Sequence, residues 1–152
     1  MRRGWRGRGR LVLAAVLVVS LAAGVGCARA GPGVSGDDPR IVIHDLEGGM
    51  DALLTGTLWY DPESRCLFVR HRPTGEVELA GLLWPPGTRP VIHDDGRRGV
   101  DAPGRGLILD GDRVEFGGGF VFRPFEFEVP EDCVPETDPG STAMFAITQL
   151  DN

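Results

Sequence analysis

The chain has 152 residues and a formal net charge of −6 at pH 7, and 41% of its positions are hydrophobic. This length suits one domain and leaves little room for two. All 16 basic residues are Arg, so a Schiff-base lysine and a phosphate-binding P-loop lysine are excluded.

The N-terminal region has the layout of an export signal. Arg occupies five of the first ten positions, and an apolar run from Leu11 to Val25 follows. A basic stretch before about fifteen apolar residues is typical of a secretory signal peptide and is short for a transmembrane helix. We therefore expect residues 1–27 to direct export. An uncleaved N-terminal anchor is the alternative.

Two processing sites follow this run. Residues 21–27, LAAGVGC, resemble a bacterial lipobox, in which the Cys27 thiol is acylated and Cys27 becomes the mature N-terminus. Gly24 departs from that pattern, because a branched residue is usual at its position. Residues 28–30 are the alternative, an A-x-A site whose cleavage after Ala30 would release a soluble protein. We expect a lipoprotein, held at the outer face of the bacterial cytoplasmic membrane.

The exported part of the chain is strongly acidic. The other 11 Arg and all 22 acidic residues lie beyond residue 27, so this part carries a formal charge of −11. Phosphate backbones and anionic lipid headgroups both repel such a body. We therefore expect no nucleic-acid partner, and we expect the lipid anchor alone to hold the domain at the membrane.

Two cysteines remain in the exported part whichever site is cut. Cys66 and Cys133 lie 67 positions apart, and outside the cytoplasm an even pair is most simply a disulfide. Closing a loop of that size contributes about 4 kcal/mol on the chain-entropy model. A metal pair is the weaker interpretation, because no C-x-x-C motif or nearby pair of spaced histidines accompanies these residues.

Beyond the signal, residues 28–40 are rich in Gly, Pro and Asp and predict a flexible linker, followed by a single β-domain over residues 41–152. No long window of this domain has a helical apolar period. Short apolar runs separated by turn residues predict strands instead. The expected strands are Ile41–Ile43, Leu53–Tyr60, Cys66–His71, Val77–Trp84, Pro90–His93, Gly106–Leu109, Arg113–Phe116, Phe125–Val129 and Ala143–Leu150. In the second of these, Leu54, Leu58 and Tyr60 are expected on one face and Thr55, Thr57 and Trp59 on the other. In residues 125–129, two Phe and one Val alternate with two Glu, the pattern of a half-buried strand.

The turn residues add three expectations. Residues 94–106 contain three Gly and one Pro and predict a loop, and Asp110-Gly111 predicts a hairpin between its flanking runs. Residues 117–119, all Gly, predict a bulge or tight corner, with an anion cradle as the alternative. Pro124 predicts a bulge or a strand break. The whole pattern favours a small antiparallel barrel, partly open and resembling the OB-fold, with a compact two-sheet sandwich as the second choice.

Short motifs spread over residues 54–133 resemble a group of small exported actinobacterial lipoproteins of unknown function. The motifs are GTL at 56–58, CLFV at 66–69, LWPPG at 83–87, GDRV at 111–114, GGG at 117–119, and Cys133. The resemblance implies export and an all-β body. It implies no catalytic residues, because the group has no established activity.

Few residues suggest chemistry. None of the Ser residues lies in a Gly-x-Ser-x-Gly elbow. His93, Asp94 and Asp95 form the best metal-like cluster, although a solvated turn is the simpler interpretation. Six aromatic residues could form a platform for a sugar ring or a peptide: Trp59, Trp84, Phe120, Phe122, Phe125 and Phe127. Trp59 is the better exposed candidate, and Trp84 is expected at a barrel end.

These observations favour a non-enzymatic, lipid-anchored β-domain that binds or scaffolds an envelope protein or glycan, without a cofactor. The alternative is a secreted enzyme or divalent-metal-binding protein that uses the residues 93–95.

Overall fold

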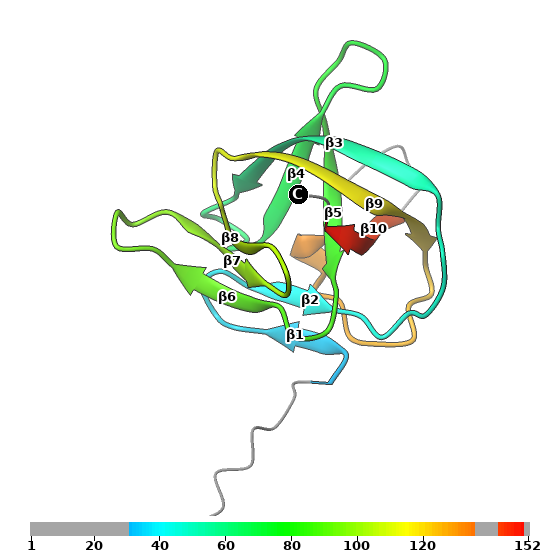
Figure 1. Ribbon diagram of the computed structural model, residues 1–152, viewed down its shortest axis with the longest axis horizontal. Coiled ribbons are helices and arrows are strands. Elements are labelled where there is room, and N and C mark those ends of the chain that lie inside the picture. The colour runs from blue at the N-terminus through cyan, green and yellow to red at the C-terminus, as the bar shows by residue number, and fades with distance from the viewer. Residues whose placement is uncertain (1–30, 136–142, 151–152) are drawn as a thin grey trace, which may run out of the picture.

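The computed structural model describes residues 31–135 and 143–150, and its centre is a closed ring of five strands (Figure 1). Each strand of the ring pairs with both neighbours in the order β3-β4-β5-β10-β9 and back to β3. β5 and β10 are parallel, and the other four pairs are antiparallel. The strands are β3 (Ala52–Tyr60), β4 (Leu67–His71), β5 (Glu78–Trp84), β9 (Arg113–Phe122) and β10 (Ala143–Leu150).

The predicted small all-β barrel is confirmed, and its strand order with one parallel pair is that of an OB-like barrel. Each of the five strands is paired on both sides, so the barrel is closed, whereas a partly open barrel was expected. Closure removes the exposed strand edges that an open sheet would leave.

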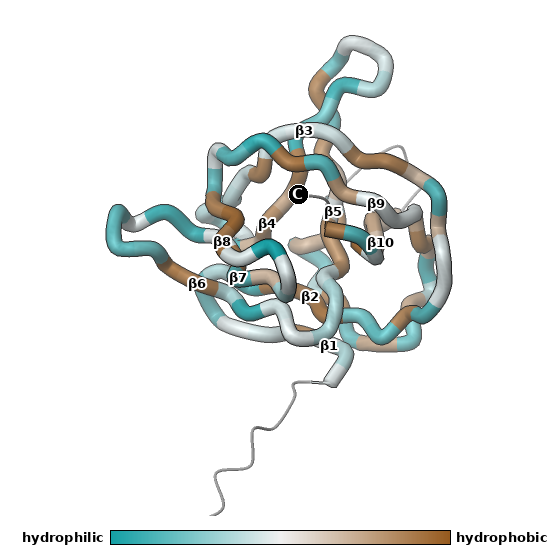
Figure 2. Tube along the Cα trace, in the orientation of Figure 1, coloured by the Kyte–Doolittle hydropathy of each residue, from teal (hydrophilic) through white to brown (hydrophobic). Residues whose placement is uncertain are grey.

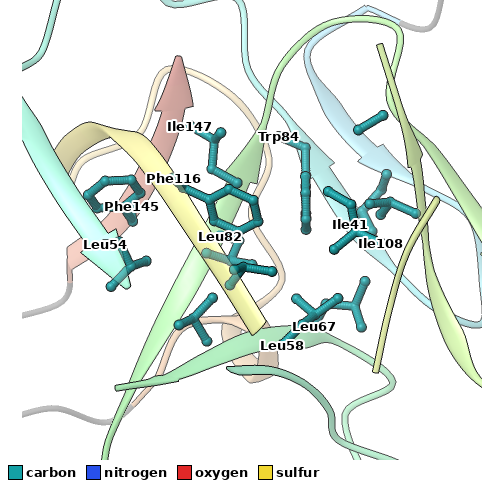
Figure 3. Close-up of a cluster of buried hydrophobic side chains, with 14 of the residues drawn as sticks. Ile41, Leu54, Leu58, Leu67, Leu82, Trp84, Ile108, Phe116, Phe145 and Ile147 are labelled. Carbon is teal, nitrogen blue, oxygen red and sulfur yellow. The ribbon is translucent and has the colours of Figure 1, made fainter. Parts of the chain in front are cut away.

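Alternate residues of each strand fill the barrel. In β3, Leu54 and Leu58 are buried inside, as the alternation of this strand predicted, while Trp59 lies on the outer side. Figure 3 shows Phe116, Phe145 and other interior side chains meeting in the middle of the ring. Burying such side chains contributes about 1.5–3 kcal/mol each, so this interior is the main source of stability.

A second sheet covers one end of the barrel. It contains β6 (Arg89–Ile92), β7 (Arg98–Ala102) and β8 (Gly106–Leu109), paired antiparallel in that order. Val100 and Ala102 of β7 and Ile108 of β8 join the barrel core, and Figure 3 shows Ile108 close to Trp84. The predicted loop over residues 94–106 was therefore wrong in part, because it contains this buried strand.

Asp110-Gly111 forms a turn but not the predicted hairpin. β8 pairs with β7, whereas β9 pairs with β3 and β10. The turn is closed by Asp112, whose N–H donates to Leu109 O at 2.9 Å and whose carboxylate accepts from Leu109 N–H at 2.9 Å. It thus passes the chain from the second sheet into the barrel.

Part of the predicted linker belongs to the folded body. β1 (Gly33–Ser35) pairs antiparallel with β2 (Ile41–Ile43), and β2 extends the barrel sheet from β5. Arg40, between them, donates its backbone N–H to Arg65 O at 2.7 Å. The ordered structure therefore includes residues 33–40, which composition alone had assigned to a flexible linker.

The three glycines at 117–119 lie inside β9, which continues through them to Phe122. None has a positive φ, so they are not the predicted corner, and their backbone is part of the ladders rather than an open anion cradle. The irregularity lies on the partner strand, where the β10 register shifts between Ile147 and Gln149. The glycines are needed for close approach, because a Cβ at Gly118 would lie 2.9 Å from a Phe145 ring carbon.

Residues 123–135 cross the outer wall of the barrel after β9 ends. The predicted break at Pro124 is confirmed, but the predicted strand over Phe125–Val129 is wrong, because this segment pairs with no strand. A short 3-10 helix, Glu131–Cys133, follows. In Figure 1 the segment is orange, and its loop lies at the lower right, at the opposite end of the picture from the tip of the β4–β5 hairpin.

Candidate functional site

The 123–135 segment forms a surface groove, which we call the Phe groove. It is an open, shallow hollow of about 420 Å³, lined by Arg123, Pro124, Phe125, Phe127, Val129 and Glu131. Small-ligand sites in proteins usually occupy about 300–1,000 Å³, combine apolar walls with few polar groups, and are largely preformed. The groove has the volume of such a site, but it is open to solvent and its lining is almost as polar as it is apolar.

The apolar wall of the Phe groove is a pair of stacked rings. Phe125 and Phe127 have ring centroids 6.3 Å apart and planes inclined by 18°. Both are half-buried, whereas Glu126 and Glu128 between and after them are exposed. The alternation that predicted a strand therefore did identify which side chains face the protein. The rings pack against buried side chains on the outer wall of the barrel, which include Val42, Leu83, Val134, Met144 and Ala146.

The charged rim of the Phe groove is a two-pronged ion pair. Arg123 donates from Nη1 to Glu131 Oε1 at 2.9 Å and from Nη2 to Oε2 at 2.6 Å. These hydrogen bonds hold the pKa of the Glu131 carboxyl below its usual value. Such paired hydrogen bonds fix geometry as well as charge. They join the start of the segment to the 3-10 helix and so close the groove at its rim.

The far end of the segment is fastened to the chain just before β4. Cys133 forms the predicted disulfide with Cys66, with Cα atoms 5.4 Å apart. Beside it, Arg40 Nη2 donates to Asp132 Oδ2 at 2.8 Å, and Arg40 Nε donates to Ser64 O at 3.1 Å. Both the disulfide and this ion pair bind the end of the groove segment to the wall of the barrel.

The three metal candidates lie in the exposed turn between β6 and β7, which is hydrophilic in Figure 2. Asp95 accepts hydrogen bonds from the Arg97 backbone N–H at 3.0 Å and from Arg97 Nε at 2.9 Å, which lower the pKa of Asp95. His93 Nδ1 lies 3.1 Å from Asp95 Oδ1. Within residues 31–135 and 143–150, no three His, Cys, Asp or Glu side chains form a group that could hold a metal ion, and Asp94 completes none.

Of the tryptophans that the structure describes, neither Trp59 nor Trp84 is an open platform. Trp84 is 1% exposed and packs edge-to-face on Phe116 inside the barrel, at a centroid distance of 5.6 Å. It therefore lies in the core, at the end of the barrel beneath the second sheet, as its place beside two prolines predicted. Trp59 is half-buried on the outer face and has the Arg70 guanidinium 4.0 Å above its ring. That guanidinium covers one face of the indole by a cation–π contact.

Sequence reasoning identified the two Phe residues of the groove among six aromatic candidates, but it missed the Arg123–Glu131 pair. The pair closes across eight residues of irregular chain, and no periodic pattern relates such positions. The single available signal was one Arg among four acids in this stretch.

Comparison with known proteins gives no relative for this chain. Among the residues that the structure describes, no helix has the length and apolar character required to span a bilayer. No protein-family model, no curated protein and no solved structure matches the chain.

Proposed function

We propose that this protein is an exported, lipid-anchored β-domain that binds a component of the cell envelope through the Phe groove and catalyses no reaction. The observation that carries the proposal is the groove itself, whose two stacked rings and ion-paired rim are built on the wall of a closed barrel. Its charged side chains hydrogen-bond each other, an arrangement that favours a shaped binding surface over a reactive group.

The sequence before the barrel supports export and anchoring. The basic stretch, the apolar run and the lipobox-like ending at Cys27 give the signal, and disulfides persist in oxidising compartments outside the cytoplasm. β1 begins at Gly33, so six residue steps separate it from Cys27. An extended chain of that length spans about 20 Å, which would keep the domain close to the membrane surface.

The anchor is tested by the mass of the protein in its host. Cells that express the full chain are fractionated, and the protein in the membrane fraction is measured by intact mass spectrometry. We expect a form that carries a diacylglyceryl group on Cys27. A soluble product that starts at Gly31 would contradict the anchor.

The binding role is tested by photo-crosslinking in intact cells. A photoreactive phenylalanine derivative replaces Phe127 in the groove or, as a matched control, Phe122, which is 61% exposed and lies outside it. We expect a specific adduct from position 127 and none from position 122. If position 127 gives no adduct beyond that of the control, the groove has no partner in the envelope and the binding proposal fails.

A further inference from the structure

We infer that the Phe groove takes a basic peptide segment of a partner protein, with an Arg or Lys side chain lying on the Phe125–Phe127 rings and attracted by the charges of Glu126 and Glu128, which are exposed beside the groove. This inference rests on the proposed binding function and adds the chemical class of the ligand. Two observations carry it: the ring pair with its apolar surroundings, and the unbalanced negative charge beside it.

The ring pair gives the ligand an apolar surface. Phe125 and Phe127 are only half-buried although they pack on the barrel wall, so part of each ring faces the groove, together with Val129. Long basic side chains combine a methylene stem that packs on such a surface with a cation that favours a ring face. Arg123 already shows this contact, since its guanidinium carbon lies 5.9 Å from the Phe125 ring centroid.

The charge beside the groove is negative and not internally balanced. Residues 123–135 contain one Arg and four acids. Arg123 pairs with Glu131, and Arg40 pairs with Asp132. Within the described parts of the chain, 31–135 and 143–150, no salt bridge involves Glu126 or Glu128, which are both exposed.

The charge complementarity decides the class of occupant. The part of the chain beyond residue 27 has a formal charge of −11, so an acidic peptide, a phosphate-rich polymer or an anionic glycan is repelled as it approaches, while a basic segment is attracted. A neutral glycan could stack on the rings but would gain nothing from the two unpaired carboxylates. A basic peptide uses both the rings of the groove and the negative charge beside it.

The test uses labelled hexapeptides and the full-length protein purified from its host membrane with the disulfide intact. Binding is measured by fluorescence anisotropy with the peptide (Arg-Leu)₃, its acidic counterpart (Glu-Leu)₃, and a neutral chitin hexasaccharide as competitor. We expect saturable binding of (Arg-Leu)₃, no binding of (Glu-Leu)₃ and no competition by the oligosaccharide.

Matched variants locate the binding. Glu126→Gln/Glu128→Gln removes two exposed charges and is expected to weaken (Arg-Leu)₃ binding by about three- to tenfold. Glu76→Gln/Glu78→Gln removes the same charge with the same spacing near the tip of the β4–β5 hairpin, which lies at the opposite end of the picture from the loop of the groove segment (Figure 1). This pair is expected to change binding less than about twofold.

The ring pair is tested by Phe125→Ser/Phe127→Ser, which is expected to weaken binding by about tenfold or more. Since both rings also support the barrel wall, this variant counts only if its thermal unfolding stays cooperative, and the glutamate variant carries the test otherwise. Equal weakening by the two glutamate pairs would mean nonspecific attraction to an acidic protein and would overturn the inference.

Failure of the ligand class is distinguishable from failure of the proposed function. If position 127 crosslinks to an envelope component but (Arg-Leu)₃ does not bind, or the oligosaccharide displaces it, the binding function stands and the basic-peptide inference is wrong. If position 127 gives no specific adduct, the proposed function itself fails.

Discussion

Replacing Gly118 by Ala is the sharpest test of the barrel, because the middle of β9 has no room for a side chain. Gly118 lies opposite Ala52 on β3 and Ile147 on β10. An added Cβ would lie far inside van der Waals contact of the Ala146 carbonyl oxygen and 2.9 Å from a ring carbon of Phe145, which is fully buried.

The expected cost follows from which atoms must move. A carbonyl in a paired strand and a core ring cannot swing away as the end of a long side chain can, so either the β9–β10 ladder widens or Phe145 leaves its packed position. Overpacking of this kind costs about 1–3 kcal/mol, and this site belongs at the upper end. Restricting the unfolded chain returns about 0.4–1 kcal/mol, so the net loss is about 2 kcal/mol, or roughly 10 °C in Tm.

The assay is urea unfolding followed by tryptophan fluorescence, with Gly49→Ala as the matched control. Gly49 has an ordinary φ, and a Cβ there would meet no heavy atom within 4 Å, so its stability should change by less than about 0.5 kcal/mol. If Gly118→Ala is as stable as the unsubstituted protein, or if both variants lose the same stability, the close approach of β9 and β10 is not what requires glycine here.

Three further predictions concern charge, oxidation and metal. Arg98 donates a hydrogen bond to Asp38 and lowers the pKa of that carboxyl. The Asp38 carboxylate therefore stabilises the fold above its unfolded pKa near 4, and this stabilisation is lost as the pH falls through the lower folded pKa. Asp38→Asn should lower the free energy of unfolding at pH 7 and reduce its fall between pH 7, 5 and 3, as measured by urea unfolding, and an unchanged fall would contradict this. Reducing the Cys66–Cys133 disulfide should lower the free energy of unfolding by about 4 kcal/mol, as measured by urea midpoints with and without reductant, and two free thiols in exported protein would refute the pair. Calorimetric titration with Zn²⁺ or Ca²⁺ should give no saturable heat, whereas saturable heat abolished by His93→Ala would favour the metal-dependent enzyme that residues 93–95 could serve.

The elements that sequence predicted well are those whose pattern is local. In β3, each residue alternates between the core and the outer face, and the alternation of Leu54 and Leu58 with threonines and Trp59 predicted the facing directly. The disulfide was equally predictable, because two cysteines in a domain expected outside the cytoplasm leave few alternatives to pairing with each other. Neither inference needed to know which strands are neighbours.

Which strands pair with each other could not be predicted from the sequence in this way. Asp110-Gly111 has the composition of a hairpin turn, and nothing within four residues of it indicates that β8 pairs backward with β7. β7 itself was overlooked because its two buried apolar side chains, Val100 and Ala102, lie between Gly, Asp and Pro residues typical of a loop. Which partner a strand takes is decided by the burial of such side chains against the barrel, a contact between distant residues.

The groove could not be predicted from the sequence for a related reason. The way it is held to the barrel also links the two parts of the proposed function. Phe125 and Phe127 alternate with glutamates as in a strand, but their rings pack on the barrel wall and the segment pairs with no strand. Because the segment has no strand partner, its position is fixed at its ends, and the Cys66–Cys133 disulfide holds one end beside β4. A reducing compartment would release that end, so a groove with fixed geometry requires the oxidising surroundings to which the signal would deliver it. Reduction should therefore weaken peptide binding as well as stability, and binding that is indifferent to reduction would separate the groove from the disulfide.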